Sequence, residues 1–188
     1  MFTPAVIALL FIQVVLTEMK TTPKDIMITF LGIFYVVGFL LFIPLLHGSE
    51  NGKFLVWYIL LAAWGTDTFA YFVGIAIGKH KFSKISPKKS IEGCIGGTLG
   101  AILVTLTYTW IINTHAGMEF EYWYIAVITL IFSVLGQIGD LSASSIKRHL
   151  EIKDFGNLLP GHGGILDRID SIIFIAPFAY VLLTMINI

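Results

Sequence analysis

The sequence predicts an all-α, polytopic integral membrane protein with about six transmembrane helices. Of its 188 residues, 56% are hydrophobic and 13% are charged, and the mean hydropathy is +0.86. An average soluble domain is about a quarter charged. The apolar runs are long and continuous, which favours helices over the alternating strands of a membrane barrel. Basic residues gather in every second connection between these runs, as expected of a polytopic membrane protein.

Six apolar segments approach the length of a bilayer crossing, which needs about 20 mainly apolar residues. They cover residues 2–19, 26–46, 54–78, 91–112, 122–139 and 171–186. The formal net charge of zero gives no global field that would favour nucleic acid, so no nucleic-acid partner is expected. The one cysteine, Cys94, cannot form a disulfide within the chain, and we interpret it as a small packing residue.

The connections between these segments define a topology. Eleven of the twelve Lys and Arg residues lie in the first, third and fifth connections, and only Lys53 lies elsewhere. The positive-inside rule makes the basic side cytoplasmic. Met1 would then lie outside without a signal peptide, so we expect either further spans before this chain or a short member of a longer family.

Asp67 lies near the middle of the third segment, within WGTDTFAY. A carboxylate at that depth costs about 2.5–3.5 kcal/mol on insertion scales, so intramembrane acids are candidates for function by default. One interpretation is a protonated Asp67 that bonds to Thr66, Thr68 or a neighbouring helix. We favour the other interpretation, in which Asp67 lines a polar cavity that reaches into the membrane.

The fifth segment runs into the polar stretch GQIGDLSASSIKRHL. If the helix continues past residue 139, Asp140, Ser144 and Lys147 fall at i, i+4 and i+7 on one face, with Arg148 beside them. This face offers a carboxylate, a hydroxyl and two cations. A solvated helix end would explain the basic pair, but it explains less well an acid at the membrane boundary followed by three serines.

The stretch KDFGNLLPGHGGILDRID, residues 153–170, is a polar block between two apolar segments. Asp167 and Asp170 are one helical turn apart if the sixth segment begins early. Together with Asp140 they could hold one or two hard divalent ions such as Mg²⁺, which prefers carboxylates, phosphates and waters. The glycines around His162 allow backbone N–H groups to approach an anion, although a glycine-rich turn alone is a weak signal.

A second basic stretch, SPKKSIEGCIGG, precedes the fourth segment. Ser90 is a predicted helix N-cap, with Glu92 in the first turn. Lys88 and Lys89 would lie beside the positive end of that helix, a favourable place for phosphate. The alternative is a positive-inside anchor with ordinary capping, and spacing alone does not decide between the two.

These features favour one kind of chemistry. Acids for a metal, cations for a polyphosphate and a glycine loop are all predicted at the cytoplasmic boundary of the membrane. A nucleotide would arrive from water and an amphiphile from the lipid. Phosphoryl or nucleotidyl transfer to a lipid is the resulting hypothesis, with catalysis mainly by alignment and charge neutralisation.

Residues 144–170, SSIKRHLEIKDFGNLLPGHGGILDRID, resemble the signature of the phosphatidate cytidylyltransferases, also called CDP-diacylglycerol synthases. That signature runs Ser, two residues, Lys-Arg, four residues, Lys-Asp, and later Pro-x-His-Gly-Gly and Asp-Arg-x-Asp. All its fixed positions are met, at Ser144, Lys147, Arg148, Lys153, Asp154, Pro160, His162, Gly163, Gly164, Asp167, Arg168 and Asp170. WGTDTFAYFVG and SPKKSIEGCIGG also resemble family segments, so the resemblance covers about residues 57–188.

The resemblance implies that CTP and phosphatidate give CDP-diacylglycerol and pyrophosphate, with Mg²⁺ as cofactor. The number of divalent ions and the presence of a monovalent cation stay open. We expect a bacterial inner (cytoplasmic) membrane, with the active site on the cytoplasmic side that the positive-inside rule indicates. A homodimer is a further expectation to be tested. The predicted domains are N-terminal transmembrane helices, residues 1–53, shorter than in the family, and a catalytic region, residues 54–188.

The resemblance also implies roles for individual residues. The predicted metal ligands are Asp140 and Asp167, with Asp170 as orienter or further ligand. The predicted phosphate partners are Lys147, Arg148, Arg168 and His162. The remaining substrate-binding candidates are Asp67, Lys88, Lys89, Ser90, Ser144, Lys153, Asp154, Gly163 and Gly164.

Ala143 departs from the family pattern, because many relatives carry Glu at this position. If that Glu helps to hold a metal, another acid or a water must replace it here. The chain is also shorter than is usual in the family. Three alternatives stay open: a CTP-dependent enzyme acting on an ether lipid, like a CDP-archaeol synthase; a transporter that uses Asp67 and Asp140; and an inactive fragment or scaffold.

Overall fold

The computed structural model describes residues 2–17, 20–83, 85–87, 89–156 and 163–185. Every regular element in these ranges is helical, and one isolated bridge between Lys81 and Ser90 is the sole strand-like pairing among them. The predicted all-α class is therefore confirmed. The chain divides into two compact units, one ending at Leu41 and the other beginning at Phe42. The predicted division at residue 53 is a functional one and stays a prediction.

The first unit contains α1 (Phe2–Leu16), α2 (Pro23–Ile33) and a π-helical turn, η1 (Phe34–Gly38). A capping box begins α2: the Thr22 hydroxyl accepts from the Asp25 backbone N–H, and the Asp25 carboxylate accepts from the Thr22 N–H at 2.9 Å. Pro23 takes the first helical position, where its missing N–H costs nothing.

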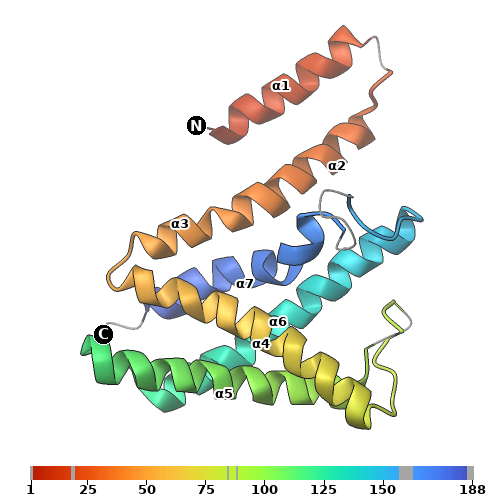
Figure 1. Cartoon of the computed structure of the whole chain (residues 1–188). Coiled ribbons are helices and arrows are strands. Elements are labelled where there is room, and N and C mark those ends of the chain that lie inside the picture. Colours follow the sequence, from red (N-terminus) through yellow and green to blue (C-terminus); the bar gives the residue numbers. More distant parts are fainter. Residues whose placement is uncertain (1, 18–19, 84, 88, 157–162, 186–188) are drawn as a thin grey trace. The chain divides into compact units, whose positions relative to one another are not determined.

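The second unit contains α3 (Phe42–His47), α4 (Gly52–Ile77), α5 (Ile91–Ala116), α6 (Tyr122–His149) and α7 (Leu166–Thr184). Figure 1 shows α4 and α5 side by side, and these two helices share the most extensive contact in the unit. Next in extent, α6 packs against α7 and α5. The core between them is apolar and includes the fully buried Tyr58, Phe132 and Ile175.

Glycines on α5 let α4 approach closely. A Cβ placed on Gly97 would lie 2.6 Å from the Thr66 carbonyl oxygen, and one on Gly93 would lie 2.8 Å from the Ala70 carbonyl oxygen. Both contacts are with backbone atoms, which cannot move aside like a flexible side chain. The small residues therefore set the spacing of the two helices, as they do in many membrane bundles.

Buried hydroxyls join α4, α5 and α6. The Tyr58 hydroxyl is 2.8 Å from Thr109 Oγ1, and Thr105 and Thr129 pair at 2.9 Å. In an apolar bundle such groups need partners within the protein, because an unsatisfied hydroxyl is costly there. These pairs therefore fix the register of the three helices.

Four helical stretches in the described part are long and apolar enough to cross a membrane: Pro23–His47, Gly52–Ile77, Ile91–Ala116 and Tyr122–His149. The chain is thus an integral membrane protein, and its predicted count of about six spans stays a prediction. Of the other two apolar segments, the one in α1 is short. The other, in α7, follows three charged residues at the start of its helix.

The ends of two helices bear on the site. α6 continues through Lys147 and Arg148 to His149, as the placement of Asp140, Ser144 and Lys147 on one face required. α7 begins at Leu166, five residues before the predicted apolar segment, so Asp167 and Asp170 both lie in its first turns.

Candidate active site

A cavity of about 440 Å³ lies where α4, α5 and α6 meet the loop that joins α4 to α5. Its size is within the range typical of small-molecule sites. It is lined by Thr66, Asp67, Ala70, Tyr71, Gly74, Ile75, Ser86, Lys89, Ser90, Gly93, Cys94, Gln137 and Asp140. Four of the predicted site residues therefore share one cavity: Asp67, Lys89, Ser90 and Asp140.

Lys89 and Asp140 form an ion pair across this cavity, between the loop before α5 and the helix α6. Their side chains are 24% and 27% exposed. The Asp140 Oδ2 atom is buried, and it accepts no hydrogen bond from the described residues besides this contact with the ammonium group. Among the described residues, the Lys89 ammonium is therefore the partner of Asp140 Oδ2.

Asp67 lies in α4 and is exposed to the cavity. The neighbouring Thr66 hydroxyl does not bond to it, because it donates to Ser133 Oγ at 2.8 Å. Asp67 interacts electrostatically with Lys89 and Asp140. Asp67 therefore lines this cavity beside Lys89 and Asp140, and its role in substrate binding stays a prediction.

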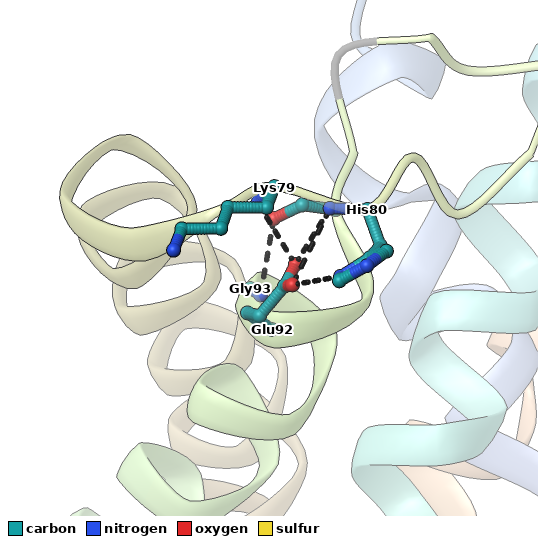
Figure 2. A network of polar contacts seen from close by, with 5 residues as sticks. Lys79, His80, Glu92 and Gly93 are labelled. Carbon is teal, nitrogen blue, oxygen red and sulfur yellow. Dashed lines mark hydrogen bonds and ion pairs between the residues drawn. The ribbon is translucent and has the colours of Figure 1, made fainter.

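The loop before α5 is anchored to the helix start. The Ser90 hydroxyl accepts from the Gly93 N–H at 3.1 Å, which confirms the predicted N-cap. Figure 2 shows the Glu92 carboxylate turned back to the loop, where it accepts from the backbone N–H groups of Lys79 and His80, each at 3.2 Å, and lies 2.6 Å from His80 Nδ1. Lys88 lies outside the described residues.

A second polar cluster surrounds Asp167 at the start of α7. Lys147 Nζ donates to Asp167 Oδ1 at 2.7 Å, and the backbone N–H groups of Phe155 and Gly164 donate to Oδ2 at 2.9 and 3.0 Å. The Asp167 side chain is 5% exposed and lies before the apolar part of α7, which begins at Ser171. Burial raises the pKa of this carboxyl, but the hydrogen bonds from Lys147 and the two N–H groups outweigh that effect and leave the pKa lowered.

The glycines of the signature lie against this cluster. Gly163 has a φ of 79°, a left-handed conformation that glycine adopts without strain. A Cβ on Gly164 would lie 2.9 Å from the Gly156 backbone nitrogen, so the two ends of this loop touch. The acceptor for the Gly164 N–H is the Asp167 carboxylate itself. His162 lies outside the described residues.

Asp170 lies one turn further along α7 and is 6% exposed. Its Oδ1 accepts from the Ser171 N–H at 2.8 Å. A Cβ on Gly139 would lie 2.9 Å from the Asp170 carbonyl oxygen, so α6 and α7 touch beside Asp140. Asp170 interacts electrostatically with Asp140 and Asp67, which line the cavity, and with Lys147, which pairs with Asp167.

The remaining predicted residues lie around these two groups. Ser144 is half-buried on α6, whereas Arg148, Lys153, Asp154 and Arg168 are exposed. Ala143, where many relatives carry Glu, is 2% exposed within the helix packing. A Glu at this position would need a polar partner, because a buried charge is costly without one.

The predicted metal ligands differ in how the surrounding residues engage them. Among the described residues, no three His, Cys, Asp or Glu side chains form a group that could hold a metal by themselves. Mg²⁺ is often bound through only one or two carboxylates, with substrate phosphates and waters completing its shell. Asp140 fits such a site, because its buried Oδ2 already contacts a cation, and Asp170 is its acidic neighbour. Asp167 is engaged by Lys147 and two N–H groups, so its role as a ligand stays a prediction.

Sequence reasoning missed several parts of the site. Tyr71, Cys94 and Gln137 line the cavity. Gln137 Nε2 donates to Thr98 Oγ1 at 3.2 Å and to Ser133 Oγ at 3.3 Å. Helical spacing could have indicated Gln137, because it lies one turn before Asp140 on the same helix. Nothing in the local sequence identifies Cys94 as a cavity residue.

Comparisons with known proteins show the family to which the chain is related. Residues 1–186 match the family model described as the cytidylyltransferase family. The chain is 41% identical over 184 residues to a phosphatidate cytidylyltransferase of Bacillus subtilis (strain 168), covering 97% of this chain and 67% of that protein. It is 40% identical over 171 residues to the phosphatidate cytidylyltransferase of Staphylococcus epidermidis strain RP62A and 39% identical to that of Staphylococcus aureus strain COL. Both staphylococcal alignments cover 90% of this chain and 63% of the relative.

Proposed function

The chain belongs to the cytidylyltransferase family, and we propose that it transfers a cytidylyl group from CTP to phosphatidate. The products are CDP-diacylglycerol, an intermediate for phospholipid biosynthesis, and pyrophosphate. The observation that carries this proposal is the shared cavity of Asp67, Lys89 and Asp140 in a chain whose relatives are named phosphatidate cytidylyltransferases. The chain spans about two thirds of the length of those relatives, so their activity is proposed for it and not assigned.

The reaction needs alignment more than acid–base chemistry. A phosphate oxygen of phosphatidate attacks the α-phosphorus of CTP, and the bond from that phosphorus to the bridging oxygen of the β-phosphate breaks as pyrophosphate leaves. A phosphate monoester is largely ionised near neutral pH, since its second pKa is about 6, so no strong general base is needed. The protein's task is to bring two anions together and to neutralise their charge.

Basic residues at different places in the fold would neutralise different phosphates. Lys89 and Ser90 lie at the start of α5, where an ammonium group and a helix N-terminus both favour a phosphate of CTP. Arg148 and Arg168 lie exposed near the ends of α6 and α7 and would neutralise further phosphate oxygens. Lys147, which pairs with Asp167, would be a further cation for the phosphate oxygens. His162 is proposed as a hydrogen-bond donor to phosphate.

Asp140 and Asp170 would hold Mg²⁺, with Asp167 as the further predicted ligand. When bound, Mg²⁺ polarises the phosphoryl oxygens and offsets the charge that develops on the leaving pyrophosphate. Asp67 would keep the inner wall of the cavity polar. Asp167, as the structure holds it, positions Lys147 and the loop between α6 and α7.

We also propose that the site faces the cytoplasm of a bacterial cytoplasmic membrane. Eleven of the twelve basic residues lie in the same set of connections, and the relatives named above are bacterial. CTP would reach the cavity from that side. A homodimer stays a prediction, which light scattering of the purified protein would test.

The test is a pyrophosphate-release assay on the purified chain with CTP, phosphatidate and Mg²⁺. We expect turnover that requires all three, and we expect Asp140→Asn and Asp167→Asn each to abolish it. An archaeal ether-lipid acid should be a poor substrate, and conversion of that lipid alone would show that the substrate is wrong. Undiminished turnover in both Asn variants would exclude the proposed metal site.

A further inference from the structure

The ion pair between Lys89 and Asp140 joins two different parts of the fold across the cavity. Lys89 lies in the loop between α4 and α5, and Asp140 lies on α6. The Asp140 Oδ2 atom is buried and has no other hydrogen-bond donor among the described residues. The ammonium group of Lys89 therefore occupies the position at which another cation would reach this carboxylate.

The backbone of Lys89 is fixed, so this contact does not depend on a freely moving loop. The Lys89 N–H donates to the Ser86 carbonyl at 3.1 Å, and the Lys89 carbonyl accepts from the Phe82 N–H at 2.9 Å. The next residue, Ser90, caps α5 and is bridged to Lys81. Only the flexible side chain of Lys89 has to move for its ammonium to leave Asp140.

The charges around the cavity favour a cation of higher charge. Lys89 interacts with Asp67 as well as with Asp140, and Asp170 lies within electrostatic range of both acids. The ammonium groups of Lys89 and Lys147 thus lie among the carboxylates of Asp67, Asp140, Asp167 and Asp170, and Lys147 is already paired with Asp167. A divalent ion on Asp140 would be better matched to this excess of negative charge, and a phosphate beside Ser90 would offer Lys89 a new partner.

We propose that Lys89 is a positioning residue whose ammonium competes with the divalent cation for Asp140. When the metal binds, the Lys89 side chain moves and pairs with a phosphate of the substrate. This inference rests on the proposed function, which supplies both the metal and the phosphate. By linkage, a phosphate that draws Lys89 away strengthens metal binding, and a bound metal strengthens phosphate binding. Without nucleotide, the site therefore keeps a weak affinity for metal.

The test measures metal binding without nucleotide. Purified protein in detergent, stripped of metal, is titrated with Mn²⁺, and free Mn²⁺ is followed by electron paramagnetic resonance. We expect Lys89→Met to bind Mn²⁺ at least about fivefold more tightly than the wild type, the lower end of typical coupling between linked sites. Lys89→Arg keeps the cation and should bind as weakly as the wild type.

Two controls define the competition. Lys81→Met removes an exposed charge from the same loop and leaves the Asp140 pair intact, so its Mn²⁺ affinity should stay within about twofold of the wild type. When Asp140→Asn is also present, chains with Lys89→Met and with the unchanged Lys89 should have the same Mn²⁺ affinity. If Lys89→Met changes the circular dichroism spectrum, Lys89→Gln takes its place with the same expectation.

Equal or weaker Mn²⁺ binding by Lys89→Met, or equal tightening by Lys81→Met, would overturn the proposal. The pyrophosphate-release assay on the same wild-type preparation separates this result from a failure of the proposed function. If the wild type turns over CTP but Lys89→Met and the wild type bind Mn²⁺ equally, only the proposed competition between Lys89 and the metal is overturned. Tighter binding by Lys89→Met in a chain that does not turn over CTP would overturn only the function.

Discussion

Lys147 and Asp167 lie 20 residues apart in the chain, and their side chains meet at 2.7 Å between the last turns of α6 and the first turn of α7. Both are largely buried, with 14% and 5% of the side chains exposed. The same carboxylate accepts from two backbone N–H groups of the intervening loop. Asp167 therefore joins two helices and a loop through one side chain.

Asp167→Asn should lower the free energy of unfolding by about 3–5 kcal/mol, because it leaves the buried Lys147 ammonium without its counter-charge. Lys147→Met should cost a similar amount, because it leaves the buried Asp167 carboxylate without its counter-charge. The double variant should lose clearly less than the sum of the two, measured by denaturant unfolding in detergent micelles. Additivity within about 0.5 kcal/mol would show that the two residues act independently.

The lowered pKa of Asp167 predicts a pH dependence of this stabilisation. A carboxyl whose pKa in the folded state lies below its ordinary value of 3.8 stabilises the fold above that value. The stabilisation is lost as the pH falls through the lowered pKa. We therefore expect the difference in unfolding temperature between the wild type and Asp167→Asn to be constant near neutral pH and to shrink below about pH 4. A difference that grows on acidification would contradict this sign.

The spacing of α4 and α5 is predicted to depend on Gly97. A Cβ there would lie 2.6 Å from the Thr66 carbonyl oxygen, so Gly97→Ala should force the helices apart at a cost of about 1–3 kcal/mol. Thermal unfolding in detergent measures this loss. Gly32→Ala is the matched control, because a Cβ on Gly32 meets nothing within 4 Å, and it should be neutral or slightly stabilising. Equal effects of the two variants would exclude a steric role for Gly97.

Ser133 is predicted to be the centre of the buried polar contacts behind the cavity. Its hydroxyl bonds to Thr66 at 2.8 Å, Thr98 at 2.9 Å and Gln137 at 3.3 Å. Ser133→Ala should cost about 1–3 kcal/mol of unfolding free energy, because it leaves these groups short of a partner. Ser142→Ala, which removes only a bond to the carbonyl of Ile138 in the same helix, should cost much less. A similar loss in both variants would rule out a network centred on Ser133.

The sequence predicted those parts of the fold and the site that depend on local periodicity. The face of Asp140, Ser144 and Lys147 follows from the helical repeat once α6 continues, and the Ser90 cap follows from its place before an apolar run. The sequence did not predict the contacts between segments that lie far apart in the chain. The pairing of Lys147 with Asp167 depends on where α7 begins, and that start falls five residues before the apolar pattern does. The lining by Cys94 and Gln137 depends on how three helices pack.

The last prediction concerns Glu92, which anchors the loop that carries Lys89. Its carboxylate accepts from the backbone N–H groups of Lys79 and His80, each at 3.2 Å, and contacts His80 Nδ1 at 2.6 Å. The His80 side chain is 75% exposed and that of Glu92 23%. Contacts this close to solvent contribute little to global stability, because water screens them. Their effect should instead be local and should fall on the loop before α5.

Glu92→Ala should therefore leave the unfolding temperature nearly unchanged and raise the KM for CTP several-fold, because the segment around Lys79 and His80, which pairs with the backbone of Lys89 and Ser90 through Lys81 and Phe82, would lose its anchor. The kcat should fall less than the KM rises, since Asp140 and Asp170 are not touched by the change. His80→Ala removes only the side-chain contact and keeps both backbone bonds, so it should raise the KM less. Steady-state kinetics of pyrophosphate release measure both constants. An unchanged KM in Glu92→Ala, or a larger effect of His80→Ala, would show that the Glu92 anchor does not position the nucleotide site.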